Sequence, residues 1–399
     1  MRVTAPEATI AAGAAEPPRF DLFLHGTVFL DLIFTGLSSF PPPGVETHAS
    51  GMGSSPGGAA NLATAASRLG LRTSLAAAFG DDVYGEFCWR TLADQEDIDL
   101  SCSRTFEGWH SPVTVSMALQ GDRSMVTHAH DAPMPANQMI GHPPRSRAVV
   151  VDLAHDWSTE PGEPSWVDLA RADGALVFAD VGWDETQEWS SRTLEPLASC
   201  HAFVPNAAEA MAYTRTDTPR DALYALADRV PLAVVTNGPH GALAIDASTG
   251  EEAEVPALRV PAIDPTGAGD VFVSGLVLGT LQGWPLADRL ALGALCSALA
   301  VQQFGGSLAA PGFGDVLDWW RGVTGAEGSS AYLTSLRRRY AFLDGLRVPQ
   351  PVRERRWAAA TIGRAPRPLD SAADGTQLRP VSADPPATGG AGPVRGGAG

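Results

Sequence analysis

A glycine-rich turn that ends in an acid, residues 264–270, carries the clearest chemical signal in this sequence. It runs Asp-Pro-Thr-Gly-Ala-Gly-Asp and leads directly into an apolar stretch. Glycines allow successive N–H groups to converge on an anion at the positive end of a helix dipole. A carboxylate in the first helical turn, Asp270, can accept a proton from an attacking hydroxyl. The run predicts phosphoryl transfer to an alcohol; an ordinary glycine turn with a helix-capping Asp is the alternative.

The sequence contains no lysine, which limits how phosphate charge could be met. All 28 basic residues of the Lys and Arg count are arginine. A Walker A loop and a protein kinase each place a lysine on the nucleotide phosphates, so both designs are excluded. Schiff-base chemistry is excluded for the same reason. Backbone amides, a metal ion and arginine are left to handle the charge.

Composition restricts the class of protein and its partners. A chain of 399 residues with 44% hydrophobic content can bury a large core, and its net charge of −17 argues against a nucleic-acid surface. The four cysteines form no CxxC pair and indicate reduced thiols. No apolar run approaches the roughly 18 residues of a membrane span. We expect a cytoplasmic protein without nucleic-acid or membrane partners.

The two ends of the chain differ in composition from the middle. Residues 1–19 are rich in Ala, Pro and Glu, and residues 347–399 in Pro, Gly, Ala, Ser and Arg. Such composition is typical of disordered segments, so both ends are predicted to be tails around a body of residues 20–346. The basic run at 353–356 is either a partner-binding patch or part of a solvated tail.

Short apolar runs alternate with helical patterns through the body, which predicts an α/β protein with a parallel sheet covered by helices. We expect strands at 20–26, 28–33, 148–153, 175–179, 202–205 and 232–236, and helices at 61–69, 207–213, 219–227 and 286–304. Two segments, about 37–54 and 110–130, look instead like β-hairpin material, the second with a turn at 120–122. They could form a lid over a site or a dimer interface.

These motifs together resemble the ribokinase-like, or PfkB-type, carbohydrate kinases, from about residue 20 to residue 346. The run 264–270 is similar to the C-terminal signature of that family, with Pro265 where Thr is common. Residues 56–61, 68–70, 80–82 and Gly85 resemble its N-terminal signature in order and spacing. The resemblance implies a three-layer α/β/α fold with a mostly parallel central sheet and a small β-sheet lid.

The resemblance also implies an activity, with ATP and Mg²⁺ as cofactors. An ATP-dependent kinase would transfer the γ-phosphate to a hydroxyl of a sugar or sugar-like substrate. A nucleoside kinase, or a catalytically silent sugar-binding or regulatory relative, is the alternative. A monovalent cation near Asp264 and Thr266 and a homodimer formed through the lid are further options. Phe29 lies where ribokinases carry a polar Asn, which disfavours ribose as the acceptor.

Roles for single residues follow from the same resemblance. The catalytic group is Asp270 as base, with the backbone N–H groups of Gly267, Ala268 and Gly269 on the transferred phosphate. Substrate hydroxyls are assigned to Asp31, Gly57, Gly58 and Asn61, the nucleotide to Asn206, Thr236, Gly238 and Gly241, and magnesium, through water, to Glu209. From the residues alone, Asn206 and Glu209 could instead be a helix cap and an exposed acid, and Asp31 a turn residue. A metal site at His128 and His130 is a weaker alternative than plain surface histidines.

Overall fold

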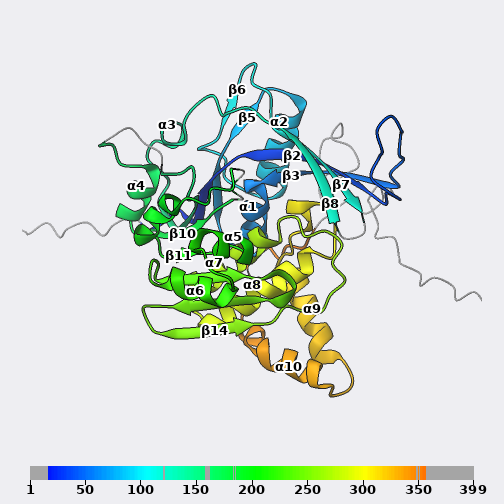
Figure 1. Cartoon of the computed structure of the whole chain (residues 1–399), viewed down its shortest axis with the longest axis vertical. Coiled ribbons are helices and arrows are strands. Elements are labelled where there is room, and N and C mark those ends of the chain that lie inside the picture. The colour runs from blue at the N-terminus through cyan, green and yellow to red at the C-terminus, as the bar shows by residue number, and fades with distance from the viewer. Residues whose placement is uncertain are drawn as a thin grey trace, which may run out of the picture.

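An eight-stranded sheet forms the centre of the protein (Figure 1). The computed structural model describes residues 17–119, 122–157, 162–182, 184, 186–346, 349 and 351–355. The strand order is β14 (Glu251–Val255), β13 (Ala242–Asp246), β12 (Leu232–Thr236), β11 (Ala202–Phe203), β10 (Leu176–Asp180), β9 (Ser146–Asp152), β1 (Phe20–His25) and β4 (Thr73–Ala76). The six strands from β12 to β4 are parallel, and β13 and β14 add an antiparallel edge. The predicted mostly parallel sheet is confirmed.

Helices cover both faces of this sheet and make three layers. One face carries α1 (Ala59–Arg68), α7 (Ala268–Leu281), α8 (Leu286–Ala300) and α9 (Phe313–Gly325), and the other α4 (Trp166–Ala172), α5 (Ala207–Thr214) and α6 (Pro219–Ala227). Successive side chains of β1 alternate between the two cores: Leu22 and Leu24 pack in the first, and Phe23 in the second. This alternation is what a strand buried on both faces requires.

A separate four-stranded sheet extends from one end of the body (Figure 1). Its order is β3 (Gly51–Gly58), β2 (Val28–Thr35), β7 (Val113–Leu119) and β8 (Asp122–His128). The predicted hairpin within 110–130 corresponds to β7 and β8, although residues 120 and 121 of its turn lie outside the described residues. We call this sheet the lid sheet. Its movement and its use in a dimer stay predictions.

Two sequence-based assignments in this region were wrong. The strand expected at 28–33 belongs to the lid sheet and not to the main one. Residues 37–50 form no strand, so β3 begins only at Gly51. The reason is pairing: β2 has β3 and β7 as its neighbours, and its own sequence pattern does not specify a partner.

No helix in the described part of the chain is long and apolar enough to span a membrane.

The remaining elements are short. They are β5 (Ala78–Gly80), β6 (Arg104–Phe106), α2 (Val83–Arg90), α3 (Ala136–Ile140) and α10 (Ala331–Arg339), with short segments of other helix types at η1 (Thr91–Gln95), η2 (Ser191–Ser199), η3 (Gly238–His240), η4 (Gly306–Ala309) and η5 (Ala341–Gly345). Helix α8 stops at Ala300, four residues before its predicted end. The carbonyl of Val301 accepts the N–H groups of Ile263 and Asp264, so the chain turns there to pack beside the glycine-rich turn.

Helices α7 and α8 pack unusually close because glycines face each other at their contact. A Cβ added to Gly275 would lie 2.9 Å from the Cα and the N of Gly293, closer than real Cβ contacts. We therefore expect Gly275→Ala to lower the free energy of unfolding by about 1–3 kcal/mol, the usual cost of overpacking. Urea denaturation of the purified variant measures this difference.

The same substitution on an exposed helix provides the control. Gly322 lies in α9, is exposed, and has open space where a Cβ would stand. There Gly322→Ala should raise the free energy of unfolding by about 0.5–1 kcal/mol, because alanine favours the helix. Equal effects at the two positions would contradict the close contact of α7 and α8.

Candidate active site

The glycine-rich turn begins α7, as its sequence predicts. Gly267 is the residue before the helix and has the left-handed conformation, with φ 73°, that glycine adopts without strain. Asp264 holds the preceding loop, since its Oδ1 accepts hydrogen bonds from the N–H and the hydroxyl of Thr266 at 2.9 and 2.5 Å. Asp270 therefore stands in the first turn of the helix, next to the positive end of its dipole.

Asp270 has the properties of a proton acceptor. Part of the residue remains exposed, but burial of its carboxyl group raises the pKa to about 6. The side-chain amide of Asn61, in α1, donates to Asp270 Oδ2 at 3.3 Å and opposes that shift in pKa. A carboxyl group that titrates near neutrality can both take and release a proton at physiological pH.

Asp31, in β2, approaches the same place from the lid sheet. A Cβ added to Gly57 would lie 2.0 Å from Asp31 Oδ2, so the carboxylate occupies the space that glycine leaves. A Cβ added to Gly306 would lie 3.1 Å from Asn61 Oδ1 and 3.6 Å from Asp31 Oδ2. We call this group, Asp31 and Asn61 with the backbone of Gly57 and Gly306, the acceptor site, after the role that we propose for it below. Gly58 adjoins this site and has φ 63°. Gly306 was not predicted as a site residue; the only sequence feature that indicates it is the glycine pair Gly305-Gly306.

A row of polar side chains crosses the lid sheet at Asp31. Strand register places Ser55 opposite Asp31 on one side and Thr114 on the other, and Thr114 pairs in turn with Thr127. The hydroxyls of Thr114 and Thr127 lie 3.0 Å apart. Ser55 Oγ and Asn61 Oδ1 are buried and have no hydrogen-bond partner within the described residues. The sequence did not predict this row, because its residues lie on different strands and only the pairing of those strands brings them into line.

Asn206 and Glu209 form the start of α5. Asn206 Oδ1 accepts the N–H of Glu209 at 3.0 Å, and Glu209 Oε2 accepts the N–H of Asn206 at 2.9 Å, which is a capping box. The helix-cap alternative thus describes their contacts. Glu209 is not an exposed acid, however, since its exposed fraction is 8%, and burial raises its pKa against these hydrogen bonds.

The other predicted nucleotide residues lie at the neighbouring strand end. Thr236 ends β12 and pairs with Asn206 across a β-bridge, so these two predicted residues are adjacent. Gly238 and Gly241 follow in a turn with φ values of 49° and 100°. A Cβ at Gly241 would lie 2.0 Å from the carbonyl oxygen of Val255, which explains the need for glycine there.

Asp180 is an acid that sequence reasoning missed. It ends β10, and its pKa is raised well above the ordinary value by burial and then by the charges of Asp270, Glu209 and Asp152. Its only sequence signal is an acid directly after a buried strand, which also occurs in ordinary loops. The structure thus links Asp270 and Glu209 electrostatically through Asp180, at the carboxyl edge of the sheet where ligands of such folds bind.

Buried carboxylates that repel one another fit a hard cation. Mg²⁺ binds through one or two carboxylates, water and substrate phosphates, and does not need a cage of protein ligands. No group of three or more His, Cys, Asp or Glu side chains that could hold a metal ion by itself occurs in the part of the chain that the structure describes, which includes His128 and His130. The carboxylates at this edge therefore suit a hydrated ion shared with a nucleotide.

The sequence of this chain has relatives among known proteins. The sequence model of the pfkB family carbohydrate kinases matches residues 21–311. The chain belongs to the PfkB family. It is 31% identical to a fructokinase of Klebsiella pneumoniae over 282 residues, 64% of this chain and 89% of that protein. It is 29% identical to a nucleoside kinase of Methanothermobacter thermautotrophicus over 297 residues, 70% and 88% of the two chains.

The fold has relatives among solved structures. A ribokinase-type structure from Escherichia coli, determined in complex with ATP and Mg²⁺, superposes with a TM-score of 0.62 at 19% identity, covering 75% of this chain and 99% of that one. This PfkB protein is accordingly a sugar or nucleoside kinase with a ribokinase-like three-layer fold. Kinases of the family use ATP and Mg²⁺.

Substitution of Gly57 tests the acceptor site. Its φ is not in the left-handed region, so Gly57→Ala is tolerated by the backbone, but the new Cβ would displace the Asp31 carboxylate. We expect the KM for the acceptor to rise roughly tenfold or more, as for other small displacements of binding groups. Gly345→Ala, at an exposed position with open space, should leave that KM unchanged. An unaltered KM in Gly57→Ala would contradict the placement of Asp31.

Proposed function

We propose that this PfkB protein transfers the γ-phosphate of ATP to a hydroxyl group of a sugar, with Asp270 as the general base. The observation that supports this most directly is the place of Asp270. Its carboxyl group titrates near neutrality, stands at the start of α7, and is joined through Asn61 to the acceptor site. An acid so placed serves proton transfer from an alcohol better than it serves helix capping.

The chemical step uses this chain's groups as follows. Asp31 and Asn61 hold acceptor hydroxyls, and Asp270 takes the proton of the attacking one. The acceptor oxygen forms a bond to the γ-phosphorus while the bond to the bridging oxygen of ADP breaks, and ADP leaves with that electron pair. Glu209, through water, and Asp180 would hold Mg²⁺, and the ion would supply positive charge to the phosphates.

Besides the metal ion and arginine, backbone amides are the source of positive charge in a protein without lysine. The N–H of Ala268 already donates to the carbonyl of Pro265 at 3.2 Å within the turn. We therefore assign the transferred phosphate chiefly to the N–H groups of Gly267 and Gly269, with Ala268 secondary. We assign the nucleotide to Asn206, Thr236, Gly238 and Gly241, because they lie together at neighbouring strand ends. A monovalent cation is assigned to Asp264 and Thr266, because their side chains offer oxygen ligands.

The polar row on the lid sheet favours a sugar over a nucleoside. Ser55, Thr114 and Thr127 present hydroxyls on the face that carries Asp31, and buried Ser55 Oγ lacks a partner within the described residues. A sugar that places a hydroxyl at Ser55 Oγ would satisfy this buried group, whereas an acceptor with few hydroxyls would leave it unpaired. The nucleoside alternative is supported by the similarity to a nucleoside kinase and by Phe29, which lies on the same face and could stack on a base.

Replacement of the base tests the proposal directly. In Asp270→Asn we expect turnover to fall about 10²- to 10⁴-fold, the usual contribution of a general base, with the fold retained. ADP release is measured over a panel of ketoses, aldoses, sugar acids and nucleosides, with the highest kcat/KM expected for a sugar. Asp288→Asn, in the first turn of neighbouring α8, is the matched control and should remain active.

Two results would count against the proposal. Wild-type turnover in Asp270→Asn would exclude this residue as the base. Sugar binding without turnover on the whole panel would instead support a catalytically silent relative.

The pKa of Asp270 predicts an acid limb in the activity. Because this pKa is raised to about 6, the base becomes protonated as pH falls through 6, and kcat/KM should drop about tenfold per pH unit below it. Asn61→Ala removes a hydrogen bond that lowers the pKa, so the limb should move to higher pH. Since Asp180 interacts with Asp270, the limb reports on the pair. A limb near the ordinary aspartate pKa, or one that moves to lower pH in the variant, would contradict this assignment.

A further inference from the structure

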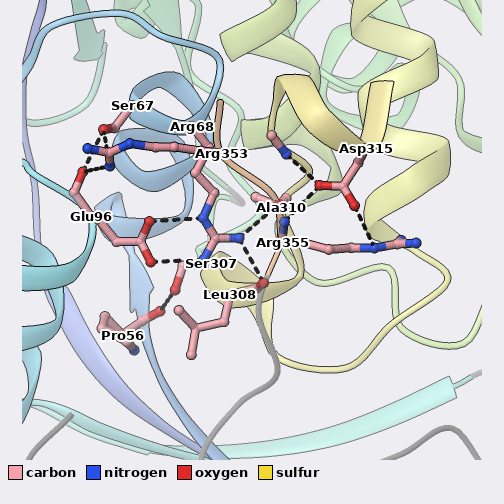
Figure 2. A network of polar contacts seen from close by, with 11 residues as sticks. Pro56, Ser67, Arg68, Glu96, Ser307, Leu308, Ala310, Asp315, Arg353 and Arg355 are labelled. Carbon is pink, nitrogen blue, oxygen red and sulfur yellow. Dashed lines mark hydrogen bonds and ion pairs between the residues drawn. The ribbon is translucent and has the colours of Figure 1, made fainter. Parts of the chain in front are cut away.

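A buried ion pair holds the loop that carries Gly306. Arg68, in the last turn of α1, donates through Nε and Nη2 to the two carboxylate oxygens of Glu96, each at 2.9 Å, and both side chains are 1% exposed. Its Nη1 donates to the carbonyls of Leu308 and Ala310 at 2.9 and 2.6 Å (Figure 2). The planar guanidinium is thus shared between an acid and the backbone of the η4 loop, residues 305–310.

The η4 loop is in direct contact with the acceptor site. Gly306 faces Asn61 and Asp31, because a Cβ added to it would lie close to the side-chain oxygens of both residues. The next residue, Ser307, donates its hydroxyl to the carbonyl of Pro56, directly before Gly57 (Figure 2). A displacement of this loop would therefore move two sides of the acceptor site together.

Arg353 reaches the same ion pair from the far end of the chain. Its Nη1 donates to the carbonyl of Glu96 at 2.7 Å and to Ser67 Oγ at 3.3 Å, and its Nη2 pairs with Asp97 Oδ2 at 3.0 Å. Asp97 has φ 54°, a left-handed conformation that is unfavourable for a non-glycine residue. Arg353 thus contacts both the carbonyl of Glu96 and the side chain of Asp97, in the turn that follows Glu96.

The chain around Arg353 fits closely against the body. Its carbonyl accepts the N–H of Gly314 at 2.9 Å, and a Cβ at Gly312 would lie 2.1 Å from that carbonyl oxygen. Arg355 adds an ion pair with Asp315 at 3.1 Å (Figure 2). It also donates a hydrogen bond to the carbonyl of Leu299 at 3.0 Å. Residues 351–355 therefore do not behave as the solvated tail that composition predicts, and they lie beyond the family match, which ends at residue 311.

We infer that Arg353 is a positioning residue for the acceptor site, acting through Glu96 and Arg68 on the η4 loop. The inference rests on the proposed function, since the acceptor site takes its role from it. Arg353 holds the backbone of Glu96, the Glu96 carboxylate orients Arg68, and Arg68 holds the carbonyls on the far side of Gly306. Each link is a charge-assisted hydrogen bond, which is strong and directional. Residues 351–355 thereby couple the C-terminal end of the described chain to acceptor binding.

Arg353→Ala in the full-length protein tests this coupling. We expect the KM for the sugar acceptor to rise roughly tenfold, by the usual effect of a misplaced binding group, while the KM for ATP changes less than about twofold. Hydrogen–deuterium exchange of peptides covering 305–310 should become faster in the same variant. Arg353→Lys keeps the charge and can still donate to the Glu96 carbonyl, so it should recover most of the acceptor affinity.

Arg338→Ala is the matched control, because Arg338 is another C-terminal arginine and lies exposed on α10. It should match the wild type in both KM values and in exchange. Wild-type acceptor KM in Arg353→Ala would overturn the inference, and so would equal rises in both KM values with a lower melting temperature, which indicate general loss of structure. A wild-type protein without turnover on any acceptor would instead overturn the proposed function.

Discussion

The position of α7 against its neighbours is the constraint on which the rest of the structure depends. Glycines at its contact with α8 let the two helices approach closely, and Ser297 of α8 donates its hydroxyl to the carbonyl of Ala268 at 2.7 Å. On the other side, Ser274 donates to the carbonyl of Leu62 in α1 at 3.2 Å. The start of α7, with Asp270, is therefore held at a set distance from Asn61 of α1. Dense packing of this kind transmits small displacements, so the helix core and the chemistry are not separable.

The buried carboxyl groups at the sheet edge lower the stability of the folded protein, and they have the raised pKa values that are typical of active sites. Burial of Asp180, Asp270 and Glu209 close together raises the pKa of each, which means that their charged forms are disfavoured in the folded protein. In the window between an ordinary aspartate pKa and the raised one, the folded state holds protons that the unfolded chain has lost, and ionisation of these groups at higher pH reduces stability. Such arrangements are typical of active sites, because a bound cation or a transferred proton relieves the repulsion.

The acceptor site combines pieces that lie far apart in the chain. The lid sheet supplies Asp31 and its polar row, α1 supplies Asn61, and the η4 loop closes the group with Gly306. Arg68 and Glu96 tie that loop to the body, and Arg353 secures the pair from the C-terminal end. A site assembled in this way can change its acceptor by substitutions in lid strands while the phosphate turn stays the same.

The sequence by itself determined the local features of this protein: the layered α/β pattern, the glycine turn that starts α7, the acid in its first turn, and the exclusion of lysine chemistry. These features depend on conformational freedom, periodicity and residue type over a few neighbouring positions. Only the tertiary structure decided that β2 joins the lid sheet, that Ser55 and Thr114 flank Asp31, that Asp180 lies close enough to Asp270 to shift its own pKa, and that Arg353 supports Glu96. Each of these depends on strand pairing or on contacts between residues far apart in the chain, which no local pattern encodes.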